Sequence, residues 1–156
     1  MGWCVEYHFL KIQWSLKTLL FIDASKLHDI EKHVKENYPL ECCGLLVGRN
    51  NPEKRIIEVY PVKNKNTERT HDRYEIDGKE FAYIDRETAK RGLQILGIYH
   101  SHPDHPAVPS AFDTERAWFG YSYMIIAIEQ GEKTEIRSWI YREEKKQFEE
   151  EEIRFP

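Results

Sequence analysis

Two histidines and an aspartate have the spacing of a metal site. His100 and His102 follow residues 93–98, a short apolar run whose β-branched residues predict a buried strand rather than a helix. Because alternate residues of a strand share one face, both imidazoles can point to the same place. Asp113 offers a carboxylate from beyond a loop that three prolines stiffen. Two imidazoles and one carboxylate would leave the fourth position of a tetrahedral zinc ion open to water, as in catalytic zinc sites.

Ser110 and Asp113 also fit a simpler interpretation. The pattern Ser-x-x-Asp ahead of residues 114–119 is typical of a capped helix start. The two interpretations are compatible, because a helix that begins at Ser110 would fix Asp113 in its first turn with the serine hydroxyl facing the same cavity. Helix capping alone, however, does not require the His-x-His sequence just upstream.

These residues resemble the signature of a known family. His-Ser-His-Pro, seven residues between His102 and Ser110, and Asp113 three residues beyond the serine together resemble the signature of the JAMM (MPN+) zinc metalloproteases. Residues 39–48 are similar to the segment of that family that carries its catalytic glutamate, which places Glu41 at the matching position. The short turn at residues 130–133 makes the chain resemble the standalone prokaryotic members.

The resemblance implies a chemistry for each matched residue. One catalytic Zn²⁺ would be held by His100, His102 and Asp113. Glu41 would take a proton from water and give it to the departing amine, and Ser110 would donate a hydrogen bond to the oxyanion of the tetrahedral intermediate. The implied reaction is hydrolysis of the peptide or isopeptide bond after the C-terminal Gly-Gly tail of a ubiquitin-like or sulfur-carrier protein.

Two further histidines are candidates for contact with substrate. His71 lies in the polar stretch 64–73, which predicts a loop beside the site, and His105 lies in the proline-rich turn after His102. An exposed loop histidine is the simpler interpretation of His71. His105 fits the geometry of the strand face poorly.

A different class of function has to be weighed as well. Some relatives of this fold lack the metal residues and serve as non-catalytic MPN-type scaffolds that bind partner proteins. Every expected ligand position is occupied in this sequence, which argues against that role. A nucleobase deaminase would need His-x-Glu together with Pro-Cys-x-x-Cys, and the sequence contains neither.

Composition and charge limit the possible partners and the location of the protein. The chain has 156 residues and suits one compact domain; its charge of −4 comes from 23 basic and 27 acidic residues that are interspersed, so we expect no nucleic-acid partner. No apolar run approaches the ~20 residues that cross a bilayer, and residues 1–20 lack the features of a secretion signal, so we expect no membrane contact and a cytoplasmic location. The sequence leaves open whether the chain forms a homodimer.

The cysteines do not suggest a disulfide framework. Cys4, Cys42 and Cys43 are odd in number, and two of them are adjacent. A nucleophilic role for Cys42 or Cys43 stays open, although small buried residues on a strand are the simpler interpretation.

The order of elements predicts an α/β fold: a single-domain mixed β-sheet flanked by helices. The JAMM/MPN fold, which is similar to that of cytidine deaminases, has the same arrangement. We expect residues 1–15 to form an N-terminal extension of unclear role and residues 16–156 to form the JAMM/MPN+ domain. We expect three helices: from Asp23 or Ser25 to the residue before Pro39, at 77–91, and from Ser110 to near Gly120. We expect strands at 16–22, 42–47, 55–62, 93–99, 123–128 and 134–141. Residues 148–155 would form an edge strand or a solvated tail.

Overall fold

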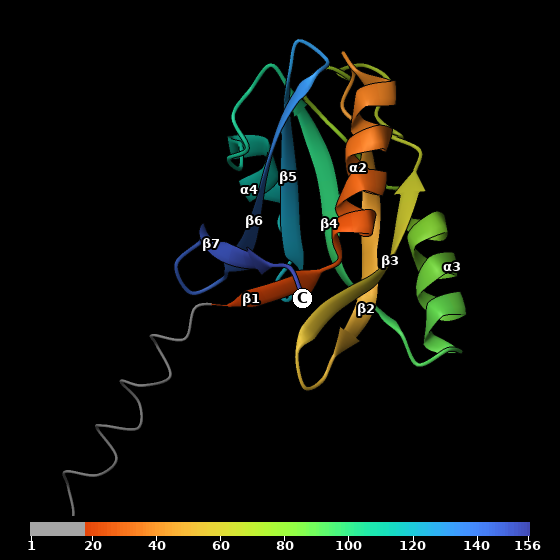
Figure 1. Cartoon of the computed structure of the whole chain (residues 1–156). Coiled ribbons are helices and arrows are strands. Elements are labelled where there is room, and N and C mark those ends of the chain that lie inside the picture. Colours follow the sequence, from red (N-terminus) through yellow and green to blue (C-terminus); the bar gives the residue numbers. More distant parts are fainter. Residues whose placement is uncertain (1–17) are drawn as a thin grey trace, which may run out of the picture.

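The computed structural model describes residues 18–156, so the expected extension at residues 1–15 lies outside the described residues. The chain alternates between strands and helices (Figure 1). The helices are α2 (Ala24–Asn37), α3 (Gly78–Ala89) and α4 (Ala111–Arg116). The strands are β1 (Leu19–Ile22), β2 (Cys43–Asn50), β3 (Lys54–Val62), β4 (Gln94–Pro103), β5 (Ser122–Glu129), β6 (Lys133–Arg142) and β7 (Gln147–Arg154).

The strands form one mixed sheet that closes on itself. Their order is β1-β3-β2-β4-β5-β6-β7, and β1 pairs in parallel with both β3 and β7. The β2–β3 hairpin and the β5–β6 and β6–β7 pairs are antiparallel, whereas β4 and β5 are parallel. The predicted mixed sheet flanked by helices is therefore confirmed, with the addition that the sheet closes into a barrel.

The acidic C-terminal segment belongs to this barrel, so the expectation of an edge strand or solvated tail at 148–155 was wrong. Strand β7 pairs with β6 on one side and with β1 on the other. Glu151 is 2% exposed, and its carboxylate accepts hydrogen bonds from Lys54 Nζ at 3.0 Å and Ser138 Oγ at 2.8 Å. These partners lie far away in the sequence, which is why a run of glutamates looked solvated.

The core is divided between the two faces of the sheet. Because side chains alternate along each strand, Leu46 faces α2 whereas Leu45 and Val47 face the other way. Helix α2 packs its Ile30 and Val34 on the first face, and α3 packs Ile84 on the second. Figure 1 shows these helices on different sides of the sheet.

Strand β4 lies at the centre of the sheet and carries both candidate histidines. It pairs antiparallel with β2 and parallel with β5, so that His100 stands beside Cys43 and Ile125. The strand is longer than the expected 93–99, because the pairing with β5 continues to Pro103. His100 and His102 consequently lie within a paired strand instead of at its end: His100 is paired with both β2 and β5, and His102 is paired with β5.

The helix boundaries follow local signals in the sequence. The side chain of Asp77 caps α3 by accepting hydrogen bonds from the backbone N–H groups of Lys79 and Glu80. Gly92 has φ +71° just beyond that helix, a conformation that favours glycine. Helix α4 ends at Arg116, earlier than the expected end near Gly120.

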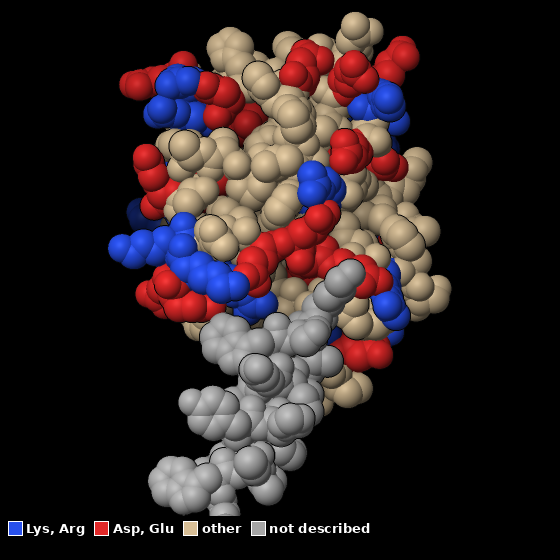
Figure 2. Space-filling view, turned by 90° about the vertical axis from the view of Figure 1, so that its left-hand side faces the viewer, with Lys and Arg blue, Asp and Glu red and all other residues tan. Residues whose placement is uncertain are grey.

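Charged side chains of both signs share the surface. On the face shown in Figure 2, acidic and basic groups lie next to each other instead of gathering by sign. Two cross-strand ion pairs, Arg137 with Glu150 at 2.8 Å and Arg142 with Glu149 at 2.9 Å, contribute to this pattern between β6 and β7. None of the helices within residues 18–156 combines the length and apolar character needed to span a membrane.

We predict that Gly97→Ala destabilises the protein by about 2 kcal/mol or more. A methyl group at position 97 would lie 2.4 Å from the backbone oxygen of Ser122, across the β4–β5 pairing that carries the site. The measurement is the free energy of unfolding from urea denaturation. Gly78→Ala is the matched control: nothing lies within 4 Å of its added methyl group, so it should leave stability unchanged or raise it by about 0.5 kcal/mol. Equal stability of the two variants would contradict this account of the strand pairing.

Candidate metal centre

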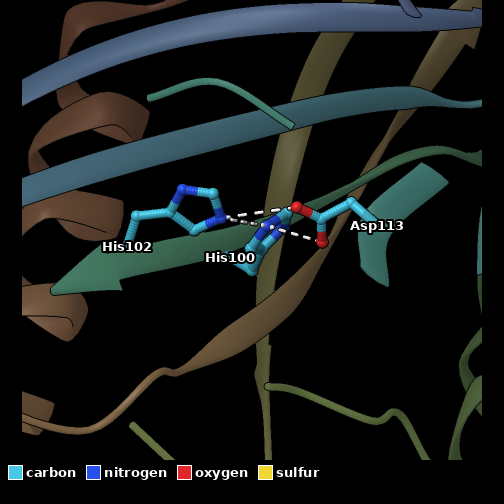
Figure 3. Close-up of side chains that lie close together, drawn as sticks. All are labelled: His100, His102 and Asp113. Atoms are coloured by element: carbon cyan, nitrogen blue, oxygen red, sulfur yellow. Dashed lines mark hydrogen bonds and ion pairs between the residues drawn. The ribbon is translucent and has the colours of Figure 1, made fainter. Parts of the chain in front are cut away.

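Three buried side chains converge beside the end of β4. One ligand atom each from His100, His102 and Asp113 lies within 4.8 Å of the other two, and all three residues are buried. The two Nε2 atoms are 3.1 Å apart, and the Asp113 carboxylate oxygens lie 3.2 Å from His100 Nε2 and 3.4 Å from His102 Nε2 (Figure 3). Zinc bonds of 2.0–2.1 Å in a tetrahedron separate neighbouring ligand atoms by about 3.3 Å. The donor atoms therefore fit a small divalent cation in type and in separation.

Strand alternation directs the two imidazoles to the same face. The intervening Ser101 points toward the α2 side of β4, where its Oγ accepts a hydrogen bond from the backbone N–H of Cys42 at 2.9 Å. Tyr99 points the same way as Ser101, and its hydroxyl lies 2.8 Å from Nδ1 of His33 on α2. His100 and His102 are thus left on the opposite face, as the sequence spacing predicted.

The first turn of α4 fixes the carboxylate of Asp113. Ser110 and Asp113 form a reciprocal capping box. The Ser110 backbone N–H and hydroxyl donate to Asp113 Oδ2 at 2.7 and 2.8 Å, and the Asp113 N–H donates to Ser110 Oγ at 3.1 Å. The capping interpretation of these two residues and the positioning of Asp113 toward the histidines both hold.

The pKa values of the three residues reflect their burial and their contact with one another. Burial raises the pKa of Asp113, but the two imidazoles and the Ser110 N–H outweigh it and hold that pKa well below its usual range. Burial lowers the pKa of His100. For His102, hydrogen bonds to Asp113 and to the Pro106 carbonyl outweigh burial and raise the pKa. The cluster therefore contains a firmly ionised carboxylate, as a metal ligand requires.

Tyr74 supports His100 in a way that sequence reasoning missed. Its ring stacks on the His100 imidazole, with centroids 4.3 Å apart and planes 23° from parallel. Nδ1 of His100 is buried and has no hydrogen-bond partner within residues 18–156. The ring contact therefore takes the orienting role that a hydrogen bond at that nitrogen usually has in metal-binding histidines.

Glu41 lies beside the cluster at the start of β2. It is 7% exposed, and burial is the main reason that its pKa is raised to about 8. His102 counteracts this shift and Asp113 reinforces it, so both groups act on the Glu41 carboxyl. The backbone N–H of Glu41 donates to Thr70 O at 2.6 Å, which ties it to the loop between β3 and α3.

The other candidates lie outside the cluster. His71 is exposed in the loop just after Thr70, and His105 is exposed in the turn after β4, where it lines a polar groove with Tyr38. Cys42 and Cys43 are buried free thiols. Burial raises the pKa of Cys42 to about 11 and that of Cys43 further, which is opposite to what a nucleophilic cysteine needs.

A cavity of about 380 Å³ lies next to the cluster, and Asp113 forms part of its wall. Along one side runs the segment that contains Tyr74 and Ile76, which belongs to no helix or strand. The N–H of the intervening Glu75 donates to the Asn64 side chain at 3.0 Å, and its C=O accepts from the Lys65 N–H at 2.8 Å. Within the described part of the chain, the main-chain N–H and C=O groups of Tyr74 and Ile76 make no hydrogen bond. This segment therefore offers free main-chain groups beside the cavity. Aromatic rings make up most of the remaining wall: Phe81, Phe112, Trp118 and Tyr123.

Comparison with known families decides the assignment. Residues 23–141 match the family described as prokaryotic homologs of the JAB domain. The chain belongs to this family. The resemblance to standalone prokaryotic JAMM-type proteins and the predicted JAMM/MPN fold are thereby confirmed.

Curated relatives and solved structures agree with this membership. The chain is 36% identical over 111 residues to a desampylase of Haloferax volcanii, covering 68% of this chain and 78% of the relative. It is 30% identical over 138 residues to a desampylase of Pyrococcus furiosus, covering 87% and 90%. A probable TtuB-protein conjugate cleaving protease of Thermus thermophilus is 30% identical over 107 residues, covering 69% of each chain. The solution structure of a protein from Desulfitobacterium hafniense is 29% identical, with a TM-score of 0.77 and coverage of 88% of this chain and 92% of that one.

We predict that Tyr74→Leu weakens divalent metal binding about tenfold, because the imidazole of His100 loses the ring that orients it. Tyr74→Phe keeps the ring and should bind the metal like the wild type. The dissociation constant for Zn²⁺, measured by competition with a chelator, distinguishes the two. Equal affinities for the leucine and phenylalanine variants would show that the stacking has no part in metal binding.

Proposed function

We propose that this protein is a zinc-dependent metallopeptidase that hydrolyses the peptide or isopeptide bond after the C-terminal Gly-Gly tail of a ubiquitin-like or sulfur-carrier protein. The observation that carries the proposal is the convergence of His100, His102 and Asp113 next to the buried carboxyl of Glu41. Relatives named desampylase and conjugate cleaving protease point to the same class of substrate.

We assign the metal to the three converging side chains. Bound there, Zn²⁺ would lower the pKa of a water molecule toward ~7 and polarise the substrate carbonyl. Two neutral imidazoles and one carboxylate leave such an ion with a net positive charge. A carboxylate oriented by Ser110 and an imidazole oriented by Tyr74 keep the donor atoms in place before the metal arrives.

Glu41 is the proposed proton carrier. Its carboxyl is buried beside His102 and Asp113, and burial raises its pKa to about 8, which is near enough to neutral pH for the group both to accept and to release a proton. It would take a proton from the attacking water and deliver it to the amine, so that the leaving nitrogen departs neutral. The hydrogen bond from its backbone to Thr70 fixes the start of this side chain.

Ser110 is the proposed donor to the oxyanion. Its hydroxyl now donates to Asp113 Oδ2, so the O–H must turn toward the substrate during the reaction. The Ser110 backbone N–H still holds the carboxylate of Asp113 after that turn. The Ser110 N–H can therefore keep the Asp113 carboxylate in place while the Ser110 hydroxyl donates a hydrogen bond to the oxyanion of the substrate.

The free main-chain groups of Tyr74 and Ile76 would give the tail a place to bind. An extended peptide can pair with free main-chain groups, and glycines pass where larger side chains would clash. Tyr74 and Ile76 lie in the wall that also contains Asp113, so a paired tail would end at the metal centre. We further propose that His71 and His105, exposed on the two loops near Glu41 and His102, contact the substrate protein.

A non-catalytic scaffold remains the alternative function. It would not require a buried proton carrier next to a complete set of metal ligands, and this favours the enzyme. The interspersed surface charges are compatible with the absence of a nucleic-acid partner (Figure 2). We also propose a cytoplasmic location.

We predict that Glu41→Gln binds zinc like the wild type but loses at least about 100-fold in kcat, because it cannot carry the proton. His102→Ala should lose both zinc and activity, because it removes a ligand. The assays are metal content after dialysis and cleavage of a fusion joined through Gly-Gly, with the products identified by mass spectrometry. Wild-type turnover by the Glu41→Gln variant would overturn the proton-transfer assignment.

We predict that Ser110→Ala lowers kcat about 100-fold while zinc remains bound, since one oxyanion donor is lost and the backbone N–H to Asp113 is kept. Thr114→Ala is a matched control, because it removes a hydroxyl that donates a hydrogen bond to the Ser110 carbonyl oxygen at 3.0 Å in the same helix turn. That variant should keep nearly full kcat. If both variants lost activity equally, the effect would come from the helix start and not from an oxyanion contact.

A further inference from the structure

Two arginines beside the metal centre lie against one aromatic ring, and one of them has an acidic neighbour: the pKa of Asp72 is lowered first by its hydrogen bond to Arg69 and, more weakly, by the charge of Arg73. The Cζ atoms of Arg73 and Arg116 lie 4.6 and 4.7 Å from the centroid of the Phe112 ring. Within residues 18–156, neither guanidinium forms an ion pair or a hydrogen bond. The neighbouring Asp72 is engaged by Arg69 through both carboxylate oxygens. Each guanidinium therefore keeps its N–H donors free for an anion beside the Phe112 ring.

This cationic pair is continuous with the proposed site. Phe112 precedes the ligand Asp113, and Arg73 precedes Tyr74, whose ring stacks on His100. Arg116 and Phe112 both line the aromatic cavity that Asp113 shares. Trp118 at the same cavity contacts the rings of Phe81 and Tyr121 and is still 57% exposed, which is unusual for so large an apolar side chain.

The free main-chain groups of Tyr74 and Ile76 determine which part of a substrate would meet these groups. A tail paired with Tyr74 and Ile76 runs along the cavity wall toward Asp113. An extended chain advances about 3.3 Å per residue, so the two residues before Gly-Gly lie roughly 7 to 13 Å from the scissile carbonyl. Those two residues would lie against the cavity and the arginines.

We propose that Arg73, Arg116 and the aromatic cavity select the tail that is cleaved: of the two residues before Gly-Gly, one is acidic and binds the guanidinium pair, and the other is apolar and fills the cavity. The inference rests on the proposed function and specifies its substrate class. A conjugated carrier with a basic tail is a poor fit to this wall.

Three acids lie near the cavity and the arginines. Asp113 has two imidazoles as partners, and Asp72 is paired with Arg69. Glu75 lines the cavity without an ion pair to either arginine, and it opposes an incoming carboxylate. Arg116 in the wall and Arg73 on the Phe112 ring together outnumber this one unpaired carboxylate, which gives an acidic tail the advantage.

Binding of short tails to the full-length, zinc-loaded Glu41→Gln protein tests this proposal without turnover. The probes are peptides that end in Gly-Gly and carry Asp, Asn or Lys at either of the two preceding positions, with Leu or Ser at the other. We expect the Asp–Leu tail to bind about 5- to 10-fold more tightly than the Asn–Leu tail, with the lysine tail weakest, and the preference to shrink as salt is raised.

Substitutions show which side chains cause the preferences for an acidic and for an apolar residue in the tail. Introducing Arg73→Gln and Arg116→Gln together should abolish the preference for Asp over Asn. Arg49→Gln, which changes an exposed arginine at the far end of β2, should leave that preference intact. Trp118→Ala should remove the preference for Leu over Ser while the charge preference stays.

Equal binding of Asp and Asn tails, or a preference for lysine that Glu75→Gln removes, would overturn the inference. So would a preference for Asp over Asn that the double arginine variant keeps unchanged. Cleavage by the wild type is measured in parallel. Tail-selective binding with no cleavage of any Gly-Gly fusion would refute the proposed function and leave the binding inference standing.

Discussion

The close approach of three buried polar side chains is the constraint on which the rest of this structure depends. Two imidazole nitrogens and a carboxylate lie 3.1–3.4 Å apart in a place where none of the three residues is more than 7% exposed. Burying such groups without a counter-charge is costly. A cation bound among them would supply the counter-charge, so the same burial would favour metal binding. The arrangement is therefore best explained by a metal ion that the fold is built to receive.

The fold meets this constraint with one strand for the two histidines and one helix for the aspartate. In the central strand β4, pairing with β2 and β5 fixes the backbone of His100, and pairing with β5 fixes that of His102. Helix α4 begins with a capping box that aims Asp113 at them. The loop between β3 and α3 contributes twice, because it fixes the backbone of Glu41 through Thr70 and leads into Tyr74. The barrel closure through β1 and β7 ties the remaining strands together around this centre.

The sequence predicted those parts of the site that depend on local spacing. His-x-His on a strand and Ser-x-x-Asp at a helix start follow from the period of a strand and the geometry of a cap, and the structure has both. Glu41 could be singled out only through the resemblance of its surroundings to a family segment. Tyr74, Arg73 and Arg116 carry no local signal, because their significance comes from contacts with residues far away in the chain. Glu151 shows the same limit for the fold, since its burial in β7 depends on Lys54 and Ser138.

We infer that His100, His102 and Asp113 together bind one zinc ion that keeps a position for water. X-ray absorption at the zinc edge of the full-length protein, loaded with one equivalent of Zn²⁺, tests this directly. We expect four light-atom ligands at about 2.0 to 2.1 Å with the scattering of two imidazoles, and we expect this spectrum to be absent from His102→Ala, which loses zinc. A sulfur ligand near 2.3 Å, or a spectrum that His102→Ala leaves unchanged, would contradict it.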